Sequence, residues 1–315
     1  MCLSGVGTSS TAPAPGGSPR ILPAHPPKTA PGGSGRRYLR PVPSQWSDED
    51  AGFRPEIPNE ARILDYLRGG KDHFAVDREA AEEALRIAPE LRIAVQQSRR
   101  FLRRAVDALV AEGMRQFIDV GCGLPTQGSV HRILQETTPG YRLVCVDKDP
   151  VVAAHAASEF GIGGPSRILL ADMRDPDVLM DDPVVTSMID PDEPVGLILH
   201  SVLAVVPEDD VADHIVRRLL ARVPPGSHLL LTHAISDPDP ETTAQLAALY
   251  QDNKTVRGSR TRSNLRTAAE VEELMRDLDL LPPGMVLLQQ WRPDTPEPEP
   301  APRSIRALGG IGRKP

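Results

Sequence analysis

The sequence predicts an α/β protein with a mostly parallel, doubly wound sheet and helices on both faces. Two observations predict this class. Short apolar runs rich in β-branched residues alternate with stretches of helical periodicity over residues 115–292. The first run, from Gln116 to Val120, also ends in a Gly-Cys-Gly turn that only small residues allow. A strand, a tight glycine turn and a helix in succession are typical of α/β proteins that bind nucleotide-like ligands.

Length and charge exclude several classes of protein. At 315 residues, one α/β domain with extensions fits better than two full domains. A formal net charge of -7 argues against non-specific binding to nucleic acid or to an anionic membrane surface. Aromatic residues make up only 3%, so a stacking surface for single strands is not expected. Because no apolar run has the length of a membrane span and no secretory signal is present, we expect a cytoplasmic protein.

The three cysteines, Cys2, Cys122 and Cys145, include no C-x-x-C pair. So few thiols, in an odd number, fit a reducing compartment and provide no framework for a metal. Cys122 lies in the glycine turn, but no histidine stands at a recognisable catalytic spacing, so we interpret Cys122 as a small filler. Cys145 alternates with valines on a predicted buried strand and is assigned to the core.

The N-terminal part divides into two segments of different character. Residues 1–55 are rich in Pro, Gly, Ser and Ala without periodicity, which predicts a disordered leader or a start site placed too far upstream. Residues 56–114 are helical in pattern and are predicted either to form a lid over the carboxyl ends of the strands or to form an oligomer interface. The helices are predicted at about 59–70, 77–87 and 90–112.

Seven strands are predicted in the remainder of the chain, which consists of a core over 115–292 and a Pro-rich hinge with a last strand over 293–315. The strands are predicted at about 116–120, 141–146, 167–170, 195–203, 228–232, 285–291 and 305–312. Helices are predicted from about 151, at 209–222, at 240–251 and from a capping box at 267–270 to about 278. The last strand is predicted at an edge of the sheet or inserted into it.

The glycine turn is a candidate ligand site. Gly121 and Gly123 permit close approach to the backbone, and the N–H groups that follow favour a carboxylate or phosphate. Thr126 stands where the dinucleotide fingerprint has its third glycine, so the loop departs from a pyrophosphate site. A tight turn without any ligand is the alternative.

Acidic residues follow the next two predicted strands. Asp147 lies 24 residues after Gly123, close to the spacing at which a carboxylate accepts both hydroxyls of a ribose. Asp172 and the apolar Met173 follow the third strand and suit the amine and the ring face of an adenine. Asp149, which precedes a proline, is better explained as a helix cap. Together with Gly123, the carboxylates of Asp147 and Asp172 predict a ligand that has a sugar and a base.

The succession F-I-D-V-G-C-G, L-V-C-V-D, L-L-A-D-M and G-L-I-L-H-S resembles class I S-adenosylmethionine-dependent methyltransferases. More closely, the chain is similar to an actinobacterial methyltransferase family with the motifs D-Y-L-x-G-G-K-D-N-F, R-x-F-L-R-R-A-V, G-x-G-L-P-T and a terminal G-R-K-P. These motifs stand here at 65–74, 99–106, 121–126 and 312–315. The resemblance extends from about residue 55 to the C-terminus. It implies the Rossmann-like methyltransferase fold, with a mostly parallel seven-stranded sheet, and S-adenosylmethionine as the ligand.

The motifs and the resemblance together give a set of candidate cofactor-binding residues, distributed over the lid and the strand ends. They are Tyr66, Gly70, Lys71, Arg100, Asp119, Gly121, Gly123, Asp147, Lys148, Asp172, Met173, His200 and Ser201. Tyr66, Gly70 and Lys71 are interpreted as part of a lid over the methionine moiety, whose carboxylate pairs with Lys71 or Arg100. A solvated helical face is the alternative for the arginine.

The predicted reaction is an in-line displacement, in which the enzyme mainly aligns the acceptor with the methyl group and excludes water. A base is required only if the acceptor must lose its proton early. The candidate bases are His200, His73 and Asp72, and Glu208 is a further one. A structural role at a strand end explains His200 equally well and is the preferred interpretation of His233.

Two positions depart from the family pattern. Because of them, alternatives to an active methyltransferase remain open. His73 replaces the usual Asn, and Ala204 replaces a His, because V-L-A-V-V-P stands where relatives have V-L-H-F-V-P. We therefore expect a methyltransferase with a small-molecule acceptor, with a catalytically silent S-adenosylmethionine-binding protein as one alternative. A nicotinamide-dependent oxidoreductase is the other, although Thr126 and the Asp-Met after the third strand argue against it. A homo-oligomer is compatible with the sequence, which identifies no acceptor.

Overall fold

The computed structural model describes residues 55–126, 128–206, 208–252, 266–295 and 300–315. The leader predicted for residues 1–55 lies outside these ranges, except for Pro55. Among the residues that are described, no helix combines the length and the apolar character that crossing a membrane requires.

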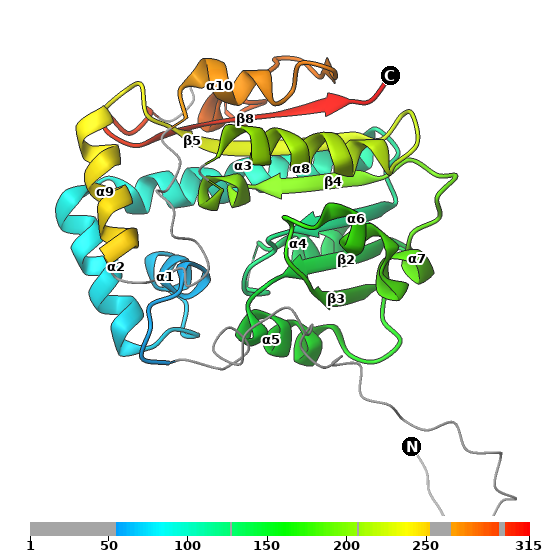
Figure 1. The fold of residues 1–315 in the computed structure, drawn as a ribbon, viewed down its shortest axis with the longest axis horizontal. Helices are drawn as coiled ribbons and strands as arrows, with labels where there is room; N and C mark the ends of the chain where they lie inside the picture. The colour runs from blue at the N-terminus through cyan, green and yellow to red at the C-terminus, as the bar shows by residue number, and fades with distance from the viewer. Residues whose placement is uncertain (1–54, 127, 207, 253–265, 296–299) are drawn as a thin grey trace, which may run out of the picture. The chain divides into compact units, whose positions relative to one another are not determined.

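One mixed sheet forms the centre of the fold (Figure 1). Its strand order is β3-β2-β1-β4-β5-β8-β6, and β7 pairs with β8 as an eighth strand. Strands β1 to β5 are parallel, whereas β8 runs antiparallel to β5, β6 and β7. The strands are β1 (Gln116–Val120), β2 (Arg142–Asp147), β3 (Ser166–Leu170), β4 (Gly196–His200), β5 (His228–Ile235), β6 (Asp279–Leu280), β7 (Val286–Leu287) and β8 (Arg306–Arg313). The predicted fold class is therefore confirmed, because the ends of β1 to β5 meet at one edge.

Helices cover both faces of this sheet. They are α1 (Glu60–Leu67), α2 (Ala75–Ile87), α3 (Leu91–Ala111), α4 (Val130–Thr137), α5 (Pro150–Phe160), α6 (Pro176–Asp181), α7 (Pro183–Met188), α8 (Asp209–Ala221), α9 (Pro240–Asp252) and α10 (Ala268–Glu273). Phe117 and Leu143 pack with α3, α4 and α5, whereas Ile118 and Val144 pack with α6, α7, α8 and α10. Because successive strand residues are buried on opposite faces, the central strands read as continuous apolar runs.

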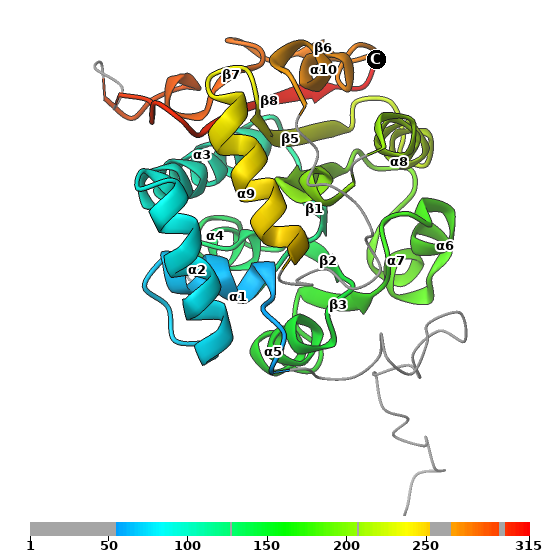
Figure 2. The ribbon, with the colours of Figure 1, turned by 60° about the vertical axis from the view of Figure 1, so that its left-hand side comes forward.

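The helical segment before β1 forms its own small core. Ile63 and Leu67 of α1 pack with Ala81 of α2 and Val95 of α3. Figure 2 shows α9 beside α2. Leu246 of α9 packs there against Ala84 of α2 and Ala88, which follows α2. Helix α3 continues into the larger core, where its second half packs on the sheet. Through α3, the α1–α2 segment is therefore attached to the main sheet.

The predicted fourth and fifth strands have different ends in the structure. The fourth strand ends at His200, not near 203, because Ser201 takes a left-handed conformation with φ 62° and a 3-10 helix, η1 (Val202–Val205), follows. The fifth strand continues to Ile235, so His233 lies inside β5 and does not end it. The extra length of β5 is explained by β8, which pairs with β5 as far as Ile235.

The strand predicted at 285–291 is mostly wrong. Only Val286 and Leu287 form a strand, and a 3-10 helix, η2 (Leu288–Gln290), follows. Arg104 of α3 explains the difference, because its side chain donates hydrogen bonds to the carbonyls of Leu288 at 2.7 Å and Trp291 at 3.0 Å. Because these two carbonyls accept hydrogen bonds from α3, they do not accept them from a neighbouring strand, and the strand stops at Leu287.

Other short elements differ from the prediction as well. Helix α10 has its predicted capping box at Thr267 and Glu270 but ends at Glu273, before the predicted end near 278. Helices α6 and α7 and strand β6 were not predicted, since a helix of six residues and a strand of two are too short to show their periods. The last predicted strand is β8, inserted between β5 and β6.

Candidate functional site

The glycine turn after β1 has the backbone conformation that the sequence predicts. Gly121 and Gly123 have positive φ angles of 73° and 64°. A Cβ atom at Gly121 would lie 2.1 Å from Cγ2 of Val202, so only glycine allows η1 to pack this closely. The Gly121 and Cys122 N–H groups donate to the carbonyl of Val146 at 2.7 and 3.1 Å. The loop is thus held between the end of β2 and the turn after β4.

Asp147, the last residue of β2, is held by the same loop. Its Oδ2 accepts a hydrogen bond from the Gly123 N–H at 3.0 Å, and its Oδ1 accepts one from the Asp149 N–H at 2.9 Å. Burial raises the pKa of this carboxyl to about 6, although the two backbone hydrogen bonds act in the opposite direction. Asp149 also caps α5, since its Oδ1 accepts from the Val151 N–H at 2.7 Å.

Asp172 follows the neighbouring strand and lies at the same edge of the sheet. Leu170 of β3 is paired with Asp147, and the Ala171 N–H donates to the Asp147 carbonyl at 3.1 Å. Asp172 Oδ1 accepts from the Arg174 N–H at 3.0 Å, and Met173 is buried. The pKa of Lys148 is lowered by burial and by Arg174, and is raised in part by the carboxylates of Asp172 and Asp147. The adjacent ends of β1, β2 and β3 therefore carry candidate residues in succession, namely Gly123, then Asp147 and Lys148, then Asp172 and Met173.

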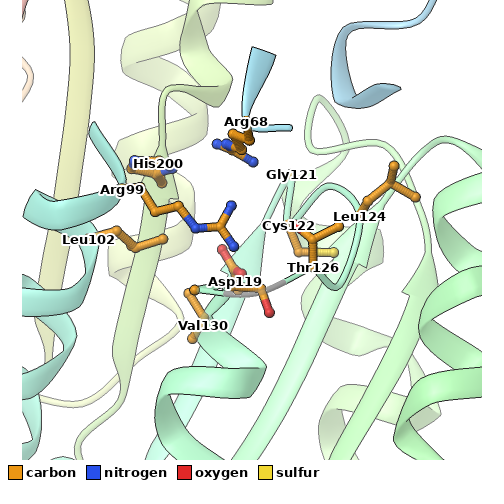
Figure 3. A pocket seen from close by; sticks show the side chains of 12 residues that line it. Arg68, Arg99, Leu102, Asp119, Gly121, Cys122, Leu124, Thr126, Val130 and His200 are labelled. Atoms are coloured by element: carbon orange, nitrogen blue, oxygen red, sulfur yellow. The ribbon is translucent and has the colours of Figure 1, made fainter. Parts of the chain in front are cut away.

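A pocket lies beside the glycine loop, between the helical segment and the sheet (Figure 3). Arg68 after α1, Arg99 of α3 and His200 of β4 project into it, and Asp119 and Cys122 form its base. Positive, negative and neutral polar groups thus face one enclosed volume. Such a constellation suits a small zwitterionic ligand.

Arg68 and Arg99 bring two guanidinium groups to this pocket. Within the described ranges, neither guanidinium makes an ion pair or a hydrogen bond, and the Arg68 Nε atom is buried without a partner. Burial, followed by the charge of Arg99, lowers the pKa of Arg68 to about 10, and burial lowers the pKa of Arg99. The charge of Asp65 raises both pKa values in part, although no ion pair joins it to either arginine in the described residues. Two partly buried guanidinium groups of this kind can bind an anion such as a carboxylate.

The carboxyl of Asp119 lies on β1, two residues before Gly121, and only 4% of the residue is exposed. Burial, followed by the charge of Asp147, raises its pKa to about 7. A ligand cation near Asp119 would favour its ionised form. The pocket therefore offers one anionic group beside two cationic ones.

His200 ends β4, and its Nε2 lies 2.9 Å from the Ser98 hydroxyl of α3. Burial, followed by the charges of Arg68 and Arg99, lowers the pKa of the imidazole to about 3. The ring is therefore neutral near pH 7. A neutral imidazole with so low a pKa is a weak base, but it can accept a hydrogen bond from a ligand.

The turn after α1 is built around Asp65. Its Oδ2 accepts from the Asp72 N–H at 2.8 Å and contacts Nδ1 of His73 at 2.9 Å. A Cβ atom at Gly70 would lie 1.9 Å from Oδ1 of Asp65, so glycine is required for this turn. The Tyr66 hydroxyl donates to Glu82, and the tyrosine ring meets His73 edge-on at 5.1 Å. These contacts hold the turn together and join α1 to α2.

The structure brings some predicted site residues together and leaves others apart. Asp119, Gly121 and His200 line the pocket, whereas Lys71, Asp72 and Arg100 have exposed side chains and are not among the residues that line it. Ser201 turns its hydroxyl toward Thr232, at 3.0 Å. Arg68, Arg99 and Ser98 were missed by the sequence analysis. Both arginines stand in quoted family motifs or beside them, but their orientation depends on how α1 and α3 pack.

Other candidates have structural roles. His233 is fully buried in β5, where its Nε2 lies 3.0 Å from Nη1 of Arg266, and burial lowers its pKa to about 4. Glu208 is exposed at the start of α8, and its carbonyl accepts from Arg266 at 3.4 Å. A hydrogen bond with Cys145 and burial raise the pKa of the Cys122 thiol well above its ordinary value. A protonated thiol of this kind is not an activated nucleophile.

Comparison with known proteins gives a consistent result. Residues 48–315 match the family model described as S-adenosyl methyltransferase. The chain is similar to the crystal structure of a candidate methyltransferase from Thermobifida fusca YX, with 34% identity, a TM-score of 0.75 and coverage of 82% of this chain and 95% of that chain. It is also similar to a DUF574 family protein from Streptomyces avermitilis MA-4680, with 34% identity, a TM-score of 0.77 and coverage of 83% and 99%. No curated protein matches the chain.

Proposed function

The chain belongs to the S-adenosyl methyltransferase family and depends on S-adenosylmethionine, and from this premise we propose how its residues hold the cofactor and which class of acceptor it methylates. The cofactor supplies an electrophilic methyl group on a sulfonium. The observation that carries the proposal is the hydrogen bond between Gly123 and Asp147, because it joins the glycine loop and an acidic strand end at one edge of the sheet.

The adenosine part is assigned to the loops after β2 and β3. Asp147 accepts hydrogen bonds from the ribose hydroxyls, since its carboxylate is already oriented by two backbone N–H groups. Asp172 accepts from the adenine amine, and the buried Met173 contacts the ring face. Lys148 interacts electrostatically with both carboxylates and balances part of their charge.

The methionine part is assigned to the pocket of Figure 3. Arg68 and Arg99 bind its carboxylate, because both guanidinium groups lack a counter-ion in the described part of the chain. Asp119 faces its ammonium group. This assignment differs from the sequence-based choice of Lys71 or Arg100, whose side chains are exposed.

The acceptor is proposed to be a small molecule that meets the methyl group near the end of β4. Among the candidates, His200 is the preferred residue to contact the acceptor, because its neutral ring lines the pocket and its Nε2 lies beside the Ser98 hydroxyl. A pKa of about 3 makes the ring a weak base, so its proposed role is to accept a hydrogen bond that orients the acceptor. His73 is less favoured since its Nδ1 contacts Asp65, and Asp72 is exposed. The lid formed by α1 and α2 excludes water from the pocket.

A catalytically silent cofactor-binding protein is the second candidate, and Ala204 is the observation that favours it. Ala204 lies in η1, where the family pattern has a histidine. His200 provides an imidazole four residues earlier in the chain, so the loss of that histidine does not leave the region without one.

Titration calorimetry with S-adenosylmethionine and S-adenosylhomocysteine tests the cofactor site. We expect both to bind one site per chain. Incubation with a labelled methyl donor and a panel of small-molecule acceptors then separates the two candidates. Labelled product supports the transferase, and binding without transfer to any acceptor supports the silent protein. Failure of both ligands to bind the wild-type protein contradicts the proposal.

A further inference from the structure

We propose that Glu60, the first residue of α1, is a second acceptor for the ribose hydroxyls of the cofactor, so that the lid closes directly on the sugar. This inference rests on the proposed function, because it takes Asp147 as the first ribose ligand. It assigns a binding role to a residue of the helical segment that no family motif quoted above contains.

The neighbours of Glu60 fix its position. On one side, Asn59 Nδ2 donates a hydrogen bond to Asp149 Oδ2. On the other side, the Ala61 Cβ atom lies 3.9 Å from where a Cβ atom at Gly123 would stand. The backbone N–H groups of Asp149 and Gly123 are the two that hold the Asp147 carboxylate. Glu60 therefore lies between two contacts that bracket Asp147.

The start of α1 is held firmly in this position. Asn59 Oδ1 accepts from the Ala61 N–H at 2.9 Å and caps the helix. The Asn59 N–H donates to Asp77 Oδ1 at 2.9 Å, and the Asp77 carboxylate also forms a buried ion pair with Arg62 at 2.8 Å. Both α1 and α2 thus contribute to placing Glu60 beside the end of β2.

The Glu60 carboxylate has unused hydrogen-bonding capacity. It is partly buried, and within the described residues its side chain makes neither a hydrogen bond nor an ion pair. Its charged neighbours are Lys148 and Asp147, and burial raises its pKa. A carboxylate removed from water without a donor is unfavourable, so a ligand that brings O–H donors is stabilised there.

The chemistry of a ribose matches this arrangement. Each oxygen of Asp147 already accepts one backbone hydrogen bond, and a ribose offers two O–H donors. A second carboxylate from the lid allows the two hydroxyls to be shared between Asp147 and Glu60. Closure of the lid is then coupled to recognition of the sugar.

Binding of S-adenosylhomocysteine and its 2′-deoxy and 3′-deoxy analogues tests the inference by calorimetry on the full chain. We expect the wild-type protein to prefer S-adenosylhomocysteine over each analogue by at least about tenfold, because each lost hydroxyl breaks a hydrogen bond to a charged group. Glu60→Ala should reduce the preference for one hydroxyl to about threefold or less. Glu60→Gln keeps an acceptor oxygen and should retain most of that preference.

Glu56→Ala is the matched control, because Glu56 is exposed just before the helix. It should leave both preferences and the thermal unfolding midpoint unchanged. Both preferences at the wild-type level in Glu60→Ala would overturn the inference while leaving the proposed function intact. No binding of S-adenosylhomocysteine to the wild-type protein would instead contradict the proposed function, and the inference with it.

Discussion

The backbone N–H of Gly123 donates a hydrogen bond to Asp147 Oδ2 at 3.0 Å, across 24 positions of the chain. This contact links the turn after β1 to the end of β2. It orients the carboxylate before any ligand arrives, so little reorganisation is needed when hydroxyl donors bind.

Asp147→Ala is expected to lower the affinity for S-adenosylmethionine by at least about tenfold, because at least one hydrogen bond to a charged acceptor is lost. The fold should persist, since removing a buried carboxylate whose pKa is raised to about 6 also removes an unfavourable charge. Calorimetry measures the affinity and circular dichroism the fold. Asp192→Ala, at an exposed position, is the control. Retained affinity in Asp147→Ala would refute the ribose assignment.

Arg99→Met is expected to weaken binding of S-adenosylmethionine by about tenfold or more, because a charge-assisted hydrogen bond to the carboxylate is lost. Binding of 5′-methylthioadenosine, which has no carboxylate, should stay unchanged. Arg100→Met is the matched control, since Arg100 is the exposed neighbour on α3. If Arg100→Met and not Arg99→Met weakens binding, the sequence-based assignment is correct and the pocket assignment is wrong.

The affinity for S-adenosylmethionine is expected to rise with pH between about 5.5 and 8. Burial raises the pKa of Asp119 to about 7 and that of Asp147 to about 6, both from an ordinary value of 3.8. Both carboxyls are thus largely protonated at the lower end and ionised at the upper end, where they attract the cationic cofactor. Calorimetry at a series of pH values measures this, and Asp119→Asn should remove the change near pH 7. An affinity that is independent of pH in the wild-type protein would contradict the assignment.

The carboxyls of Asp119 and Asp147 also determine whether the stability of the ligand-free protein rises or falls with pH. Their native pKa values lie above the ordinary 3.8, so between about pH 4 and 7 the native state binds more protons than the unfolded state. Their contribution to the free energy of unfolding therefore falls as pH rises through this window. Urea unfolding of Asp119→Asn should show a smaller fall than the wild-type protein. An equal fall in both would show that Asp119 does not titrate in this window.

The His200 ring is expected to stay neutral from pH 5 to 8, because burial and the neighbouring arginines lower its pKa to about 3. Nuclear magnetic resonance of the histidine ring signals measures this, and His200→Gln identifies the signal by its loss. The exposed His155 provides an internal comparison. A titration of the His200 signal near 6.5 would contradict the buried, neutral imidazole on which its proposed role as a hydrogen-bond acceptor depends.

Asp77→Asn is expected to destabilise the lid by about 3 kcal/mol, because it leaves the buried Arg62 guanidinium without its counter-ion. Hydrogen exchange should become faster in α1 and α2 and stay unchanged in β1 and β2. Glu79→Gln, at an exposed position on the same helix, is the control. Unchanged exchange in α1 would show that the ion pair does not hold the lid.

The sequence was sufficient for the parts of the fold and site that depend on short-range patterns. The strand ends at Val120, Asp147 and Leu170 were predicted within one residue, because apolar runs stop there at a glycine or a carboxylate. The resemblance to S-adenosylmethionine-dependent methyltransferases is confirmed by the family match over residues 48–315. Each of these features depends on residues that are close together in the chain, so their order and spacing are enough to predict it.

The remaining features depend on contacts between distant segments. The strand predicted at 285–291 is interrupted because Arg104, far away in the sequence, binds its carbonyls. Arg99 and Arg100 are adjacent in one motif, and only the packing of α3 decides that Arg99 faces the pocket. Glu60 was not among the residues predicted from the sequence. Its position near Asp147 depends on how α1 packs against the end of β2, and the residues around Glu60 do not reveal this.

The most direct test of the central claim is a crystal structure of the protein with S-adenosylhomocysteine. The expected result places the amino-acid tail between Arg68, Arg99 and Asp119, the ribose at Asp147 and the adenine at Asp172. A ligand bound away from the glycine loop, or with its ribose beyond hydrogen-bonding distance of Asp147, would contradict the account.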